Sequence, residues 1–150
     1  MNRFFRPLAS LFLFAAAAVM AHGANWTTDY AAAKEQAKAE NRHILLEFTG
    51  SDWCPPCQRL NAEVFSRSEF SAFADANLIL VKLDFPRRTE QAPELAAQNR
   101  RLAEKYGIQG FPTVIILNPS GEEIERTGYR RGGVAAYIRH LESVLARSKS

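Results

Sequence analysis

The sequence predicts an α/β domain with a mixed sheet of about four strands and helices on both faces. Two observations favour this fold class. Short apolar runs alternate with segments rich in helix-forming residues, which is the pattern of strands separated by helices. The chain also has 150 residues, 47% of them hydrophobic and 23% charged, as expected for one globular domain. We find no internal repeat, low-complexity tract or second domain.

The N-terminus has the features of a targeting segment. Arg3 and Arg6 form a positively charged start, and Leu8–Met20 is an apolar run of thirteen residues. Small residues follow, so cleavage after Gly23 or after Ala21 would satisfy a small-x-small rule. The apolar run is shorter than the ~20 residues of a membrane span, and an uncleaved anchor is the alternative interpretation.

We therefore expect a signal peptide at residues 1–23 and a mature domain at residues 24–150, exported to a bacterial periplasm. The membrane would be a partner only if the segment stays uncleaved. Without Arg3 and Arg6, the 19 basic residues of the chain fall to 17, against 16 acidic ones. A mature charge near +1 lacks the signature of nucleic-acid binding, so we expect no nucleic-acid partner.

The mature chain begins with a predicted helix and a predicted buried strand. Tyr30–Asn41 is rich in strong helix formers, and Thr28 or Asp29 can cap its start. Ile44–Phe48 is apolar apart from one acid, Glu47, and is expected to form a buried strand. A polar turn then leads to the cysteines.

A second helix and strand are predicted in the middle of the chain. Ser66 and Glu69 have the spacing of a capping box, ahead of a short helix that ends near Asp75. Leu78–Leu83 is a second buried strand. The loop Phe85–Pro93 follows, and we interpret its two arginines as solvated surface.

The remaining segments complete the sheet and add two helices. A turn of type I joins the last two strands, the second of which is more polar and is expected at an edge. A strand followed by a helix and a strand implies parallel pairing, whereas the turn adds an antiparallel edge. The predicted elements are the helix Glu94–Tyr106, the strand Thr113–Leu117, the turn Asn118–Gly121, the strand Glu122–Thr127 and the helix Val134–Ala146.

The two cysteines of the chain lie three positions apart in Trp53-Cys54-Pro55-Pro56-Cys57, between a predicted strand and a helix-like segment. A Cys-x-x-Cys pair at such a junction is typical of thiol–disulfide exchange. One thiolate attacks a substrate disulfide, and the second attacks the resulting mixed disulfide to release the product. The prolines suit a first helical turn.

Three other interpretations of the cysteine pair are open. A structural staple would contribute only about 2 kcal/mol across so short a loop. A zinc site needs about four ligands, but the chain has no second cysteine pair, and His22, His43 and His140 are isolated from one another in the sequence. The pair could also be two free buried cysteines with no chemistry. We favour redox chemistry, with no metal and with no cofactor beyond the Cys54–Cys57 disulfide.

Two motifs relate the chain to a known family. The first is Phe48–Cys57, which contains the cysteine pair, and the second is Lys105–Thr113, a Lys-Tyr-Gly-Ile sequence followed by Gly-x-Pro-Thr. With both motifs in this order, the chain from about residue 26 to its end resembles the thioredoxin superfamily, and more closely its secreted thiol:disulfide interchange branch. The resemblance implies a thioredoxin-like fold and a redox-active centre.

The resemblance also implies roles for single residues. Cys54 would be the exposed nucleophile and Cys57 the buried resolving cysteine. Pro112 would be a cis-proline facing the cysteines, and Phe111 would offer backbone groups that pair with the substrate chain like an added strand. The predicted substrate-binding residues are Trp53, Pro55, Pro56, Phe111 and Pro112.

Glu47 and Lys82 stand where the family places a buried acid and its lysine partner, which implies catalytic roles for both. Cys57 must lose its proton to resolve the mixed disulfide, and a buried carboxylate can accept that proton. Burial raises the pKa of such an acid, while the lysine opposes the rise. Glutamate replaces the family's usual aspartate, with one extra residue before the first cysteine. The alternative is a strand glutamate that pairs with Lys82 and is idle in the mechanism.

The direction of electron flow can be inferred from the residues between the cysteines. Pro55 and Pro56 have no N–H group, and no His or Lys is present there to stabilise a thiolate. Both features argue against a powerful oxidant and favour a reductase or interchange role.

Compared with a minimal thioredoxin, extra residues fall in Ser66–Ala76 and Phe85–Pro93.

We thus expect a periplasmic thiol–disulfide oxidoreductase that is a monomer, with protein thiols and disulfides and an upstream redox partner as its partners. One alternative is a thioredoxin-fold peptide-binding or assembly module that keeps its cysteines oxidised. Another is a membrane-tethered electron relay for a single partner, such as cytochrome c maturation.

Overall fold

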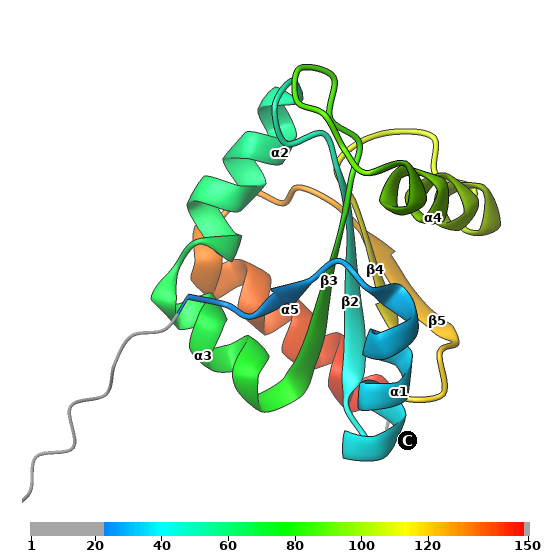
Figure 1. Cartoon of the computed structure of the whole chain (residues 1–150). Helices are drawn as coiled ribbons and strands as arrows, with labels where there is room; N and C mark the ends of the chain where they lie inside the picture. Colours follow the sequence, from blue (N-terminus) through cyan, green and yellow to red (C-terminus); the bar gives the residue numbers. More distant parts are fainter. Residues whose placement is uncertain (1–22, 149–150) are drawn as a thin grey trace, which may run out of the picture.

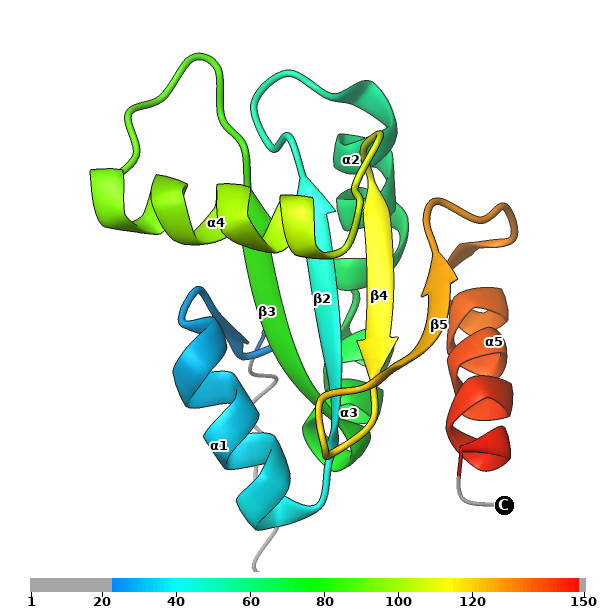
Figure 2. The ribbon, with the colours of Figure 1, turned by 90° about the vertical axis from the view of Figure 1, so that its right-hand side faces the viewer.

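The computed structural model describes residues 23–148, which form a five-stranded sheet with helices on both faces (Figures 1 and 2). The predicted fold class is confirmed, with one strand more than the four expected. All of the predicted signal peptide except Gly23 lies outside the described residues. The elements in chain order are β1 (Trp26–Thr27), α1 (Tyr30–Glu40), β2 (His43–Thr49), α2 (Pro55–Leu60), the π-helix η1 (Asn61–Phe65), α3 (Ser68–Asn77), β3 (Leu78–Asp84), α4 (Pro93–Lys105), β4 (Thr113–Leu117), β5 (Glu123–Thr127) and α5 (Gly133–Arg147).

The strand order is β1-β3-β2-β4-β5, with β3 parallel to both β1 and β2. This confirms the parallel pairing predicted across the first crossover. The same expectation is wrong for the second crossover, because β4 is antiparallel to β2. Helix α4 runs across the strands (Figure 2), so the chain enters β4 at the same end of the sheet at which β3 ends. The turn at 118–121 is confirmed, with the Gly121 N–H donating to the Asn118 oxygen at 2.9 Å.

The sheet separates two hydrophobic cores. One core packs against α2, η1, α3 and α5, and the other packs against α1 and α4 (Figure 1). On β2, Leu45 belongs to the first core, whereas Ile44 and Leu46 belong to the second. Since strand side chains alternate between faces, Glu47 lies on the face of Leu45, which also carries α2.

The helix starts confirm one prediction and correct another. The Asp29 carboxylate caps α1 by accepting the N–H of Ala32 at 2.9 Å. The predicted capping box is wrong, because α3 begins at Ser68 after Arg67, which makes no side-chain capping bond. Ser66 instead ends η1, and its N–H donates to the Asn61 oxygen. The helix that starts at the cysteines thus continues through η1 as far as Ser66. Ser66 is therefore the C-terminal cap of that helix and not the N-cap of α3.

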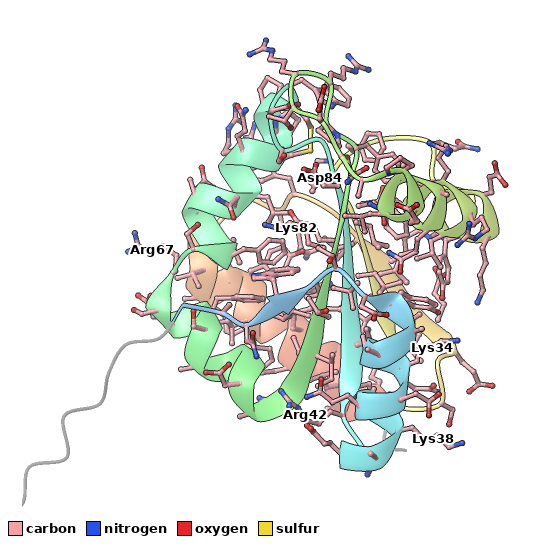
Figure 3. The ribbon with its side chains drawn as sticks, in the orientation of Figure 1. Lys34, Lys38, Arg42, Arg67, Lys82 and Asp84 are labelled. Atoms are coloured by element: carbon pink, nitrogen blue, oxygen red, sulfur yellow. A yellow bond between two sulfur atoms is a disulfide. The ribbon has the colours of Figure 1, made fainter. Side chains whose placement is uncertain are left out.

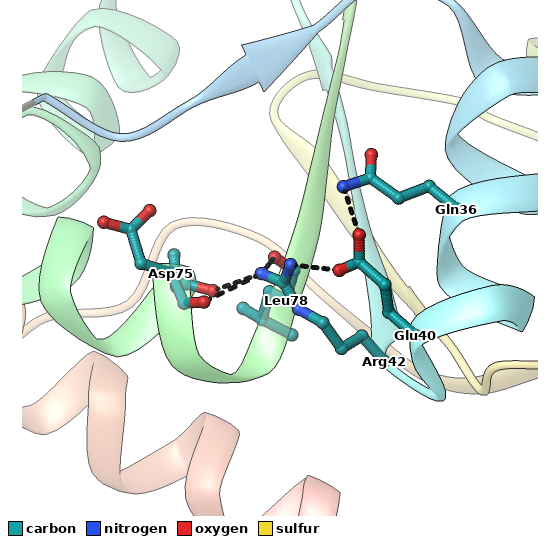
Figure 4. Close-up of polar contacts among 6 residues, drawn as sticks. Gln36, Glu40, Arg42, Asp75 and Leu78 are labelled. Atoms are coloured by element: carbon teal, nitrogen blue, oxygen red, sulfur yellow. Dashed lines mark hydrogen bonds and ion pairs between the residues drawn. The ribbon is translucent and has the colours of Figure 1, made fainter.

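Arg42, between α1 and β2, ties the start of β2 to the end of α3 (Figure 4). Its Nη2 donates to the backbone oxygens of Ala74 and Asp75, at 3.1 and 3.0 Å, and to that of Leu78. Its Nη1 donates to the Glu40 carboxylate at 2.7 Å. A guanidinium at a helix C-terminus can donate to the last carbonyls of the helix and carries the favourable charge for the helix dipole, and here it adds to the bond that the Ala74 oxygen already accepts from the Leu78 N–H.

This contact lies where the pairing of the two central strands begins. In the parallel register, His43 pairs with Leu78 and, four residues later, Glu47 pairs with Lys82. The register that begins at His43 and Leu78 thereby determines that Glu47 lies opposite Lys82, beneath the cysteines.

Candidate redox site

Cys54 and Cys57 form a disulfide at the start of α2, with their Cα atoms 5.3 Å apart. Cys54 is the N-cap residue, and its sulfur accepts the N–H of Cys57 at 3.4 Å. Pro55 and Pro56 occupy the first two helical positions, are exposed and have no N–H to donate. The disulfide is incompatible with a pair of free, chemically idle cysteines.

The structure corrects the expected exposure of Cys54. Cys54 is only 3% exposed and Cys57 only 1% exposed. The cause is the turn before the helix, in which the N–H of Cys54 donates to the Gly50 oxygen at 2.9 Å and draws the cysteine inward. The Cys57 sulfur, in turn, accepts the Gly50 N–H at 3.5 Å.

Trp53 joins the cysteine loop to two other loops. Its indole Nε1 donates to the Phe85 oxygen at 2.7 Å, and its ring meets the Phe111 ring edge-on, with the centroids 5.8 Å apart. The Arg87 guanidinium lies 3.5 Å from the centre of the Trp53 ring. Gly50 is required beneath the indole, because a Cβ there would lie 2.4 Å from a ring atom.

Asp52 anchors the loop between β3 and α4. Its carboxylate accepts the backbone N–H groups of Arg87, Arg88 and Thr89, at 3.0, 2.7 and 2.9 Å. These bonds, led by that from Arg87, hold the pKa of Asp52 below its usual value. Sequence reasoning missed this residue. The available signal was the predicted parallel pairing of β2 and β3. The loops that follow two parallel neighbours lie at the same end of the sheet, so the loop of Asp52 and the β3–α4 loop had to be close to each other.

The Phe111–Pro112 bond is cis, as the resemblance implied. Both residues are half-buried at the start of β4, which lies beside the start of α2 (Figure 2). Gly128, after β5, packs closely against this loop, since a Cβ on it would lie 2.9 Å from the Pro112 oxygen. The structure therefore brings together Trp53, Phe111 and Pro112, three of the residues that the sequence analysis names for substrate binding.

Glu47 and Lys82 lie opposite each other on β2 and β3, beneath the cysteines. Lys82 is followed on β3 by Asp84, toward the loop that Asp52 anchors (Figure 3). A cavity of about 140 Å³ is bordered by both residues and by Cys57, together with Thr49, Ser51, Gln58 and Asn61. The structure thus gives Glu47 and Cys57 a common polar cavity.

Burial raises the pKa of Glu47 to about 7, an effect that the positive charge of Lys82 opposes. Glu47 is only 1% exposed, and its Oε2 has no hydrogen-bond partner among the described residues. Within this part of the chain, no ion pair joins Glu47 to Lys82, whose ammonium lies 5.2 Å from the Trp26 ring centre. The strand glutamate held in an ion pair, considered above, is not what the structure shows.

Residues 23–148 contain no cluster of three or more His, Cys, Asp or Glu side chains suited to a metal ion. Within the same range, no helix is long and apolar enough to cross a bilayer.

A family model described as thioredoxin-like matches residues 25–119. The disulfide bond reductase DsbH of Chlamydia pneumoniae is 37% identical over 116 residues, which cover 77% of this chain and 70% of that protein. The thioredoxin-related protein DsbJ of the same organism is 28% identical over 130 residues, covering 82% of this chain but only 37% of DsbJ.

Solved structures agree with the sequence matches. A DsbH oxidoreductase has a TM-score of 0.80 at 31% identity, and the match covers 97% of this chain and 95% of that chain. A thioredoxin from Thermus thermophilus has a TM-score of 0.62 at 26% identity, with 83% and 88% covered. Together with the disulfide at the start of α2, these matches show that the chain belongs to the thioredoxin-like family and is a thiol–disulfide oxidoreductase.

Proposed function

We propose that the chain is an exported reductase of protein disulfides, and the helix start at the cysteines carries this proposal. Among the first three helical positions, only Cys57 donates an N–H to the Cys54 sulfur, because the other two are prolines. A thiolate with few donors is poorly stabilised, so the reduced protein gives up its electrons readily. The printed name of the related DsbH, a disulfide bond reductase, supports the same direction.

The proposed cycle consists of two exchange steps. The Cys54 thiolate attacks one sulfur of the substrate disulfide, forms a mixed disulfide and expels the other substrate sulfur as a thiolate. Cys57 then attacks the Cys54 sulfur, releases the second substrate sulfur and closes the Cys54–Cys57 disulfide. Two electrons pass to the substrate, and an upstream dithiol must supply them again.

Glu47 is proposed to accept the proton that Cys57 loses in the second step. The two groups border the same cavity, and a carboxyl with a pKa of about 7 is suited to take a proton and release it near neutral pH. Lys82 would act through its charge, which keeps this pKa from rising further. The cavity is polar and large enough for water to link the two groups.

The substrate is proposed to bind across Trp53, Phe111 and Pro112, beside the exposed Pro55 and Pro56. The aromatic contact between Trp53 and Phe111 places these residues on one surface. Backbone groups of the Phe111 loop would pair with the substrate chain.

Export and processing form a separate part of the proposal. The charged start and apolar run of residues 1–23 support a cleaved signal peptide, with residues 24–150 acting as a monomer in the periplasm. The N-terminal sequence and the mass of the exported protein test cleavage and oligomeric state. An intact leader would favour the membrane-tethered relay instead.

Insulin reduction tests the activity. The processed protein, supplied with a dithiol reductant, is expected to accelerate insulin reduction over reductant alone. The near-complete burial of Cys54 is the one observation that favours a second candidate, a peptide-binding module that stays oxidised. Such a module would bind peptides without any acceleration, and that result would contradict the proposed reductase.

A further inference from the structure

Five arginines that are exposed to solvent surround the redox end of the molecule. They belong to three segments, namely α2, the β3–α4 loop and the β5–α5 loop. We call them the arginine rim, and they are Arg59, Arg87, Arg88, Arg130 and Arg131.

One side of the rim is held directly at the cysteine loop. Arg87 stacks on Trp53, the neighbour of Cys54, with its guanidinium 3.5 Å from the ring centre. The N–H of Arg88 is bonded to the Asp52 carboxylate, which fixes the loop while leaving its guanidinium exposed. The position of this side of the rim is therefore set by the redox loop itself.

The other side of the rim adjoins the cis-proline loop. The Arg59 guanidinium lies 5.5 Å from the Tyr129 ring centre, so α2 contacts the β5–α5 loop. Gly128, in that loop, packs against the Pro112 oxygen. Arg130 and Arg131 follow directly along the chain, so the backbone of this segment adjoins the proposed substrate surface, and the charge of Arg130 also acts on Tyr137 and His140 of α5.

The rim guanidiniums are not neutralised by ion pairs. The salt bridges of the described residues use the arginines at 42, 126 and 147, and none belongs to the rim. The nearby carboxylates keep their charge but bond to neutral groups instead of the rim guanidiniums, with Asp52 bonded to the β3–α4 loop, Asp84 to Ser51 and Glu63 to Tyr129. Glu90 is the exposed acid of the same loop. Residues 23–148 hold 16 basic and 16 acidic side chains, so the rim is a local feature rather than a sign of general positive charge.

We propose that the arginine rim binds acidic residues flanking the substrate disulfide, and that proteins with acidic segments around a disulfide are the preferred substrates. This inference rests on the proposed reductase function and specifies its substrate class. Unpaired guanidiniums beside a reaction centre raise the rate of encounter with an oppositely charged partner, and salt screens the effect. Guanidiniums also pair with carboxylates through two parallel hydrogen bonds, which orients the bound segment.

Three peptides test the proposal. Each carries the same disulfide, flanked by acidic, neutral or basic residues, and is mixed by stopped flow with the exported, fully reduced protein. Tryptophan fluorescence, to which Trp26 and Trp53 both contribute, reports oxidation of the cysteines through Trp53, the neighbour of Cys54. The expected order of second-order rate constants is acidic, neutral, basic, with roughly tenfold between the extremes at low salt and a smaller ratio at 0.5 M salt.

Two double variants distinguish the effect of the arginine rim from that of the net charge of the protein. Arg88→Gln/Arg131→Gln removes two rim guanidiniums that have no hydrogen bond or ion pair in the described structure, and it should reduce the acidic-to-basic ratio several-fold. Arg100→Gln/Arg101→Gln is the matched control, because these exposed arginines lie on α4, which packs on the opposite face of the sheet from α2. The control should retain the wild-type ratio.

The outcomes distinguish the two proposals. Equal rates for the three peptides in the wild-type protein would contradict the proposed role of the arginine rim without contradicting the reductase function. An equal loss of preference in both double variants would do the same. Failure to reduce any of the peptides would overturn the reductase function, and the rim with it.

Discussion

At the scale of single residues, the two sulfur atoms of the disulfide have different surroundings. The Cys54 sulfur accepts one N–H from the first turn of α2, whereas Cys57 borders the cavity that also contains Glu47. The first environment determines how readily a thiolate forms for attack, and the second determines where the proton of the resolving thiol goes. Each role can be tested separately.

Removal of the resolving thiol should trap substrates. Cys57→Ala is expected to accumulate mixed disulfides through Cys54, since no second thiol can attack them. Cys54→Ala should form none. Non-reducing gels of exported protein give the measurement, and equal trapping by both variants would refute this assignment of nucleophile and resolver.

Removal of the proposed base should slow the second step alone. Glu47→Gln is expected to leave the attack by Cys54 intact and to slow resolution about 100-fold, within the usual range for loss of an acid–base group. The loss should be greatest at and below neutral pH, where few other bases are available. Stopped-flow turnover from pH 5 to 9 checks this, with Glu35→Gln, an exposed change on α1, as the control. An unaltered resolution rate would reduce Glu47 to a structural residue.

The same substitution should change the pH dependence of stability. Burial raises the pKa of Glu47 from 4.5 to about 7, so between these values the folded protein binds a proton that the unfolded chain has released. The contribution of Glu47 to stability is therefore fully present below about pH 4.5 and is lost as the pH rises through 7, a change of roughly 3 kcal/mol. Urea unfolding of the oxidised protein should show this fall in wild type and not in Glu47→Gln. Parallel pH profiles would contradict the raised pKa.

Some single-residue features could be predicted from the sequence, and others depend on contacts distant in the chain. Strand alternation was sufficient to place Glu47 on a buried face, because its neighbours Leu46 and Phe48 belong to the other core. The burial of Cys54 depends on how the turn before α2 folds back. The role of Asp52 depends on a loop 35 residues further along the chain, which no local pattern indicates.

At the scale of secondary-structure elements, Arg42 links the register of the central strands to the helix that precedes β3. Its guanidinium satisfies carbonyls at the end of α3, and it precedes the first residue of β2. The pairing of His43 with Leu78 then carries Glu47 opposite Lys82. A contact remote from the cysteines thereby supports the geometry of the site.

Loss of this contact should weaken the fold. Arg42→Ala leaves partly buried carbonyls without their charged donor, which is expected to cost about 2 kcal/mol in the free energy of unfolding. Arg101→Ala, an exposed arginine on α4, serves as the control and should change stability by less than about 0.5 kcal/mol. Urea unfolding measures both, and equal effects would show that Arg42 is an ordinary surface residue.

Element boundaries were predictable where a segment is long and periodic. The four predicted strands all form, with ends that differ by one residue at most, since apolar runs between polar turns define them. β1 was missed because two residues give no periodicity, and it exists only through its pairing with Leu80 and Val81. The π-helix η1 was missed because the sequence continues a helical pattern through it.

At the scale of the whole molecule, the topology gathers the functional loops at one end. The carboxyl ends of the parallel strands β2 and β3 lead into the cysteine loop and the β3–α4 loop, and α4 returns the chain to the same end before β4 (Figures 1 and 2). The fold class was predictable from the order of elements. The antiparallel direction of β4 was not, because it depends on the path of α4 across the sheet.

The central claim is that this end of the molecule donates electrons, because the start of α2 offers the Cys54 sulfur a single N–H. Restoring a donor at the second helical position tests the cause. Pro56→Ala supplies an N–H there, so it should stabilise the thiolate and raise the reduction potential. An unchanged potential in this variant would remove the physical basis of the claim.

The reduction potential of the Cys54–Cys57 pair tests the claim most directly. The exported protein is equilibrated with dithiol redox buffers at pH 7, and the fraction oxidised is read from alkylation of free thiols. A reductase is expected to have a reduction potential of about −270 mV, the value of thioredoxin. A value near −120 mV, typical of a strong thiol oxidant, would contradict the account.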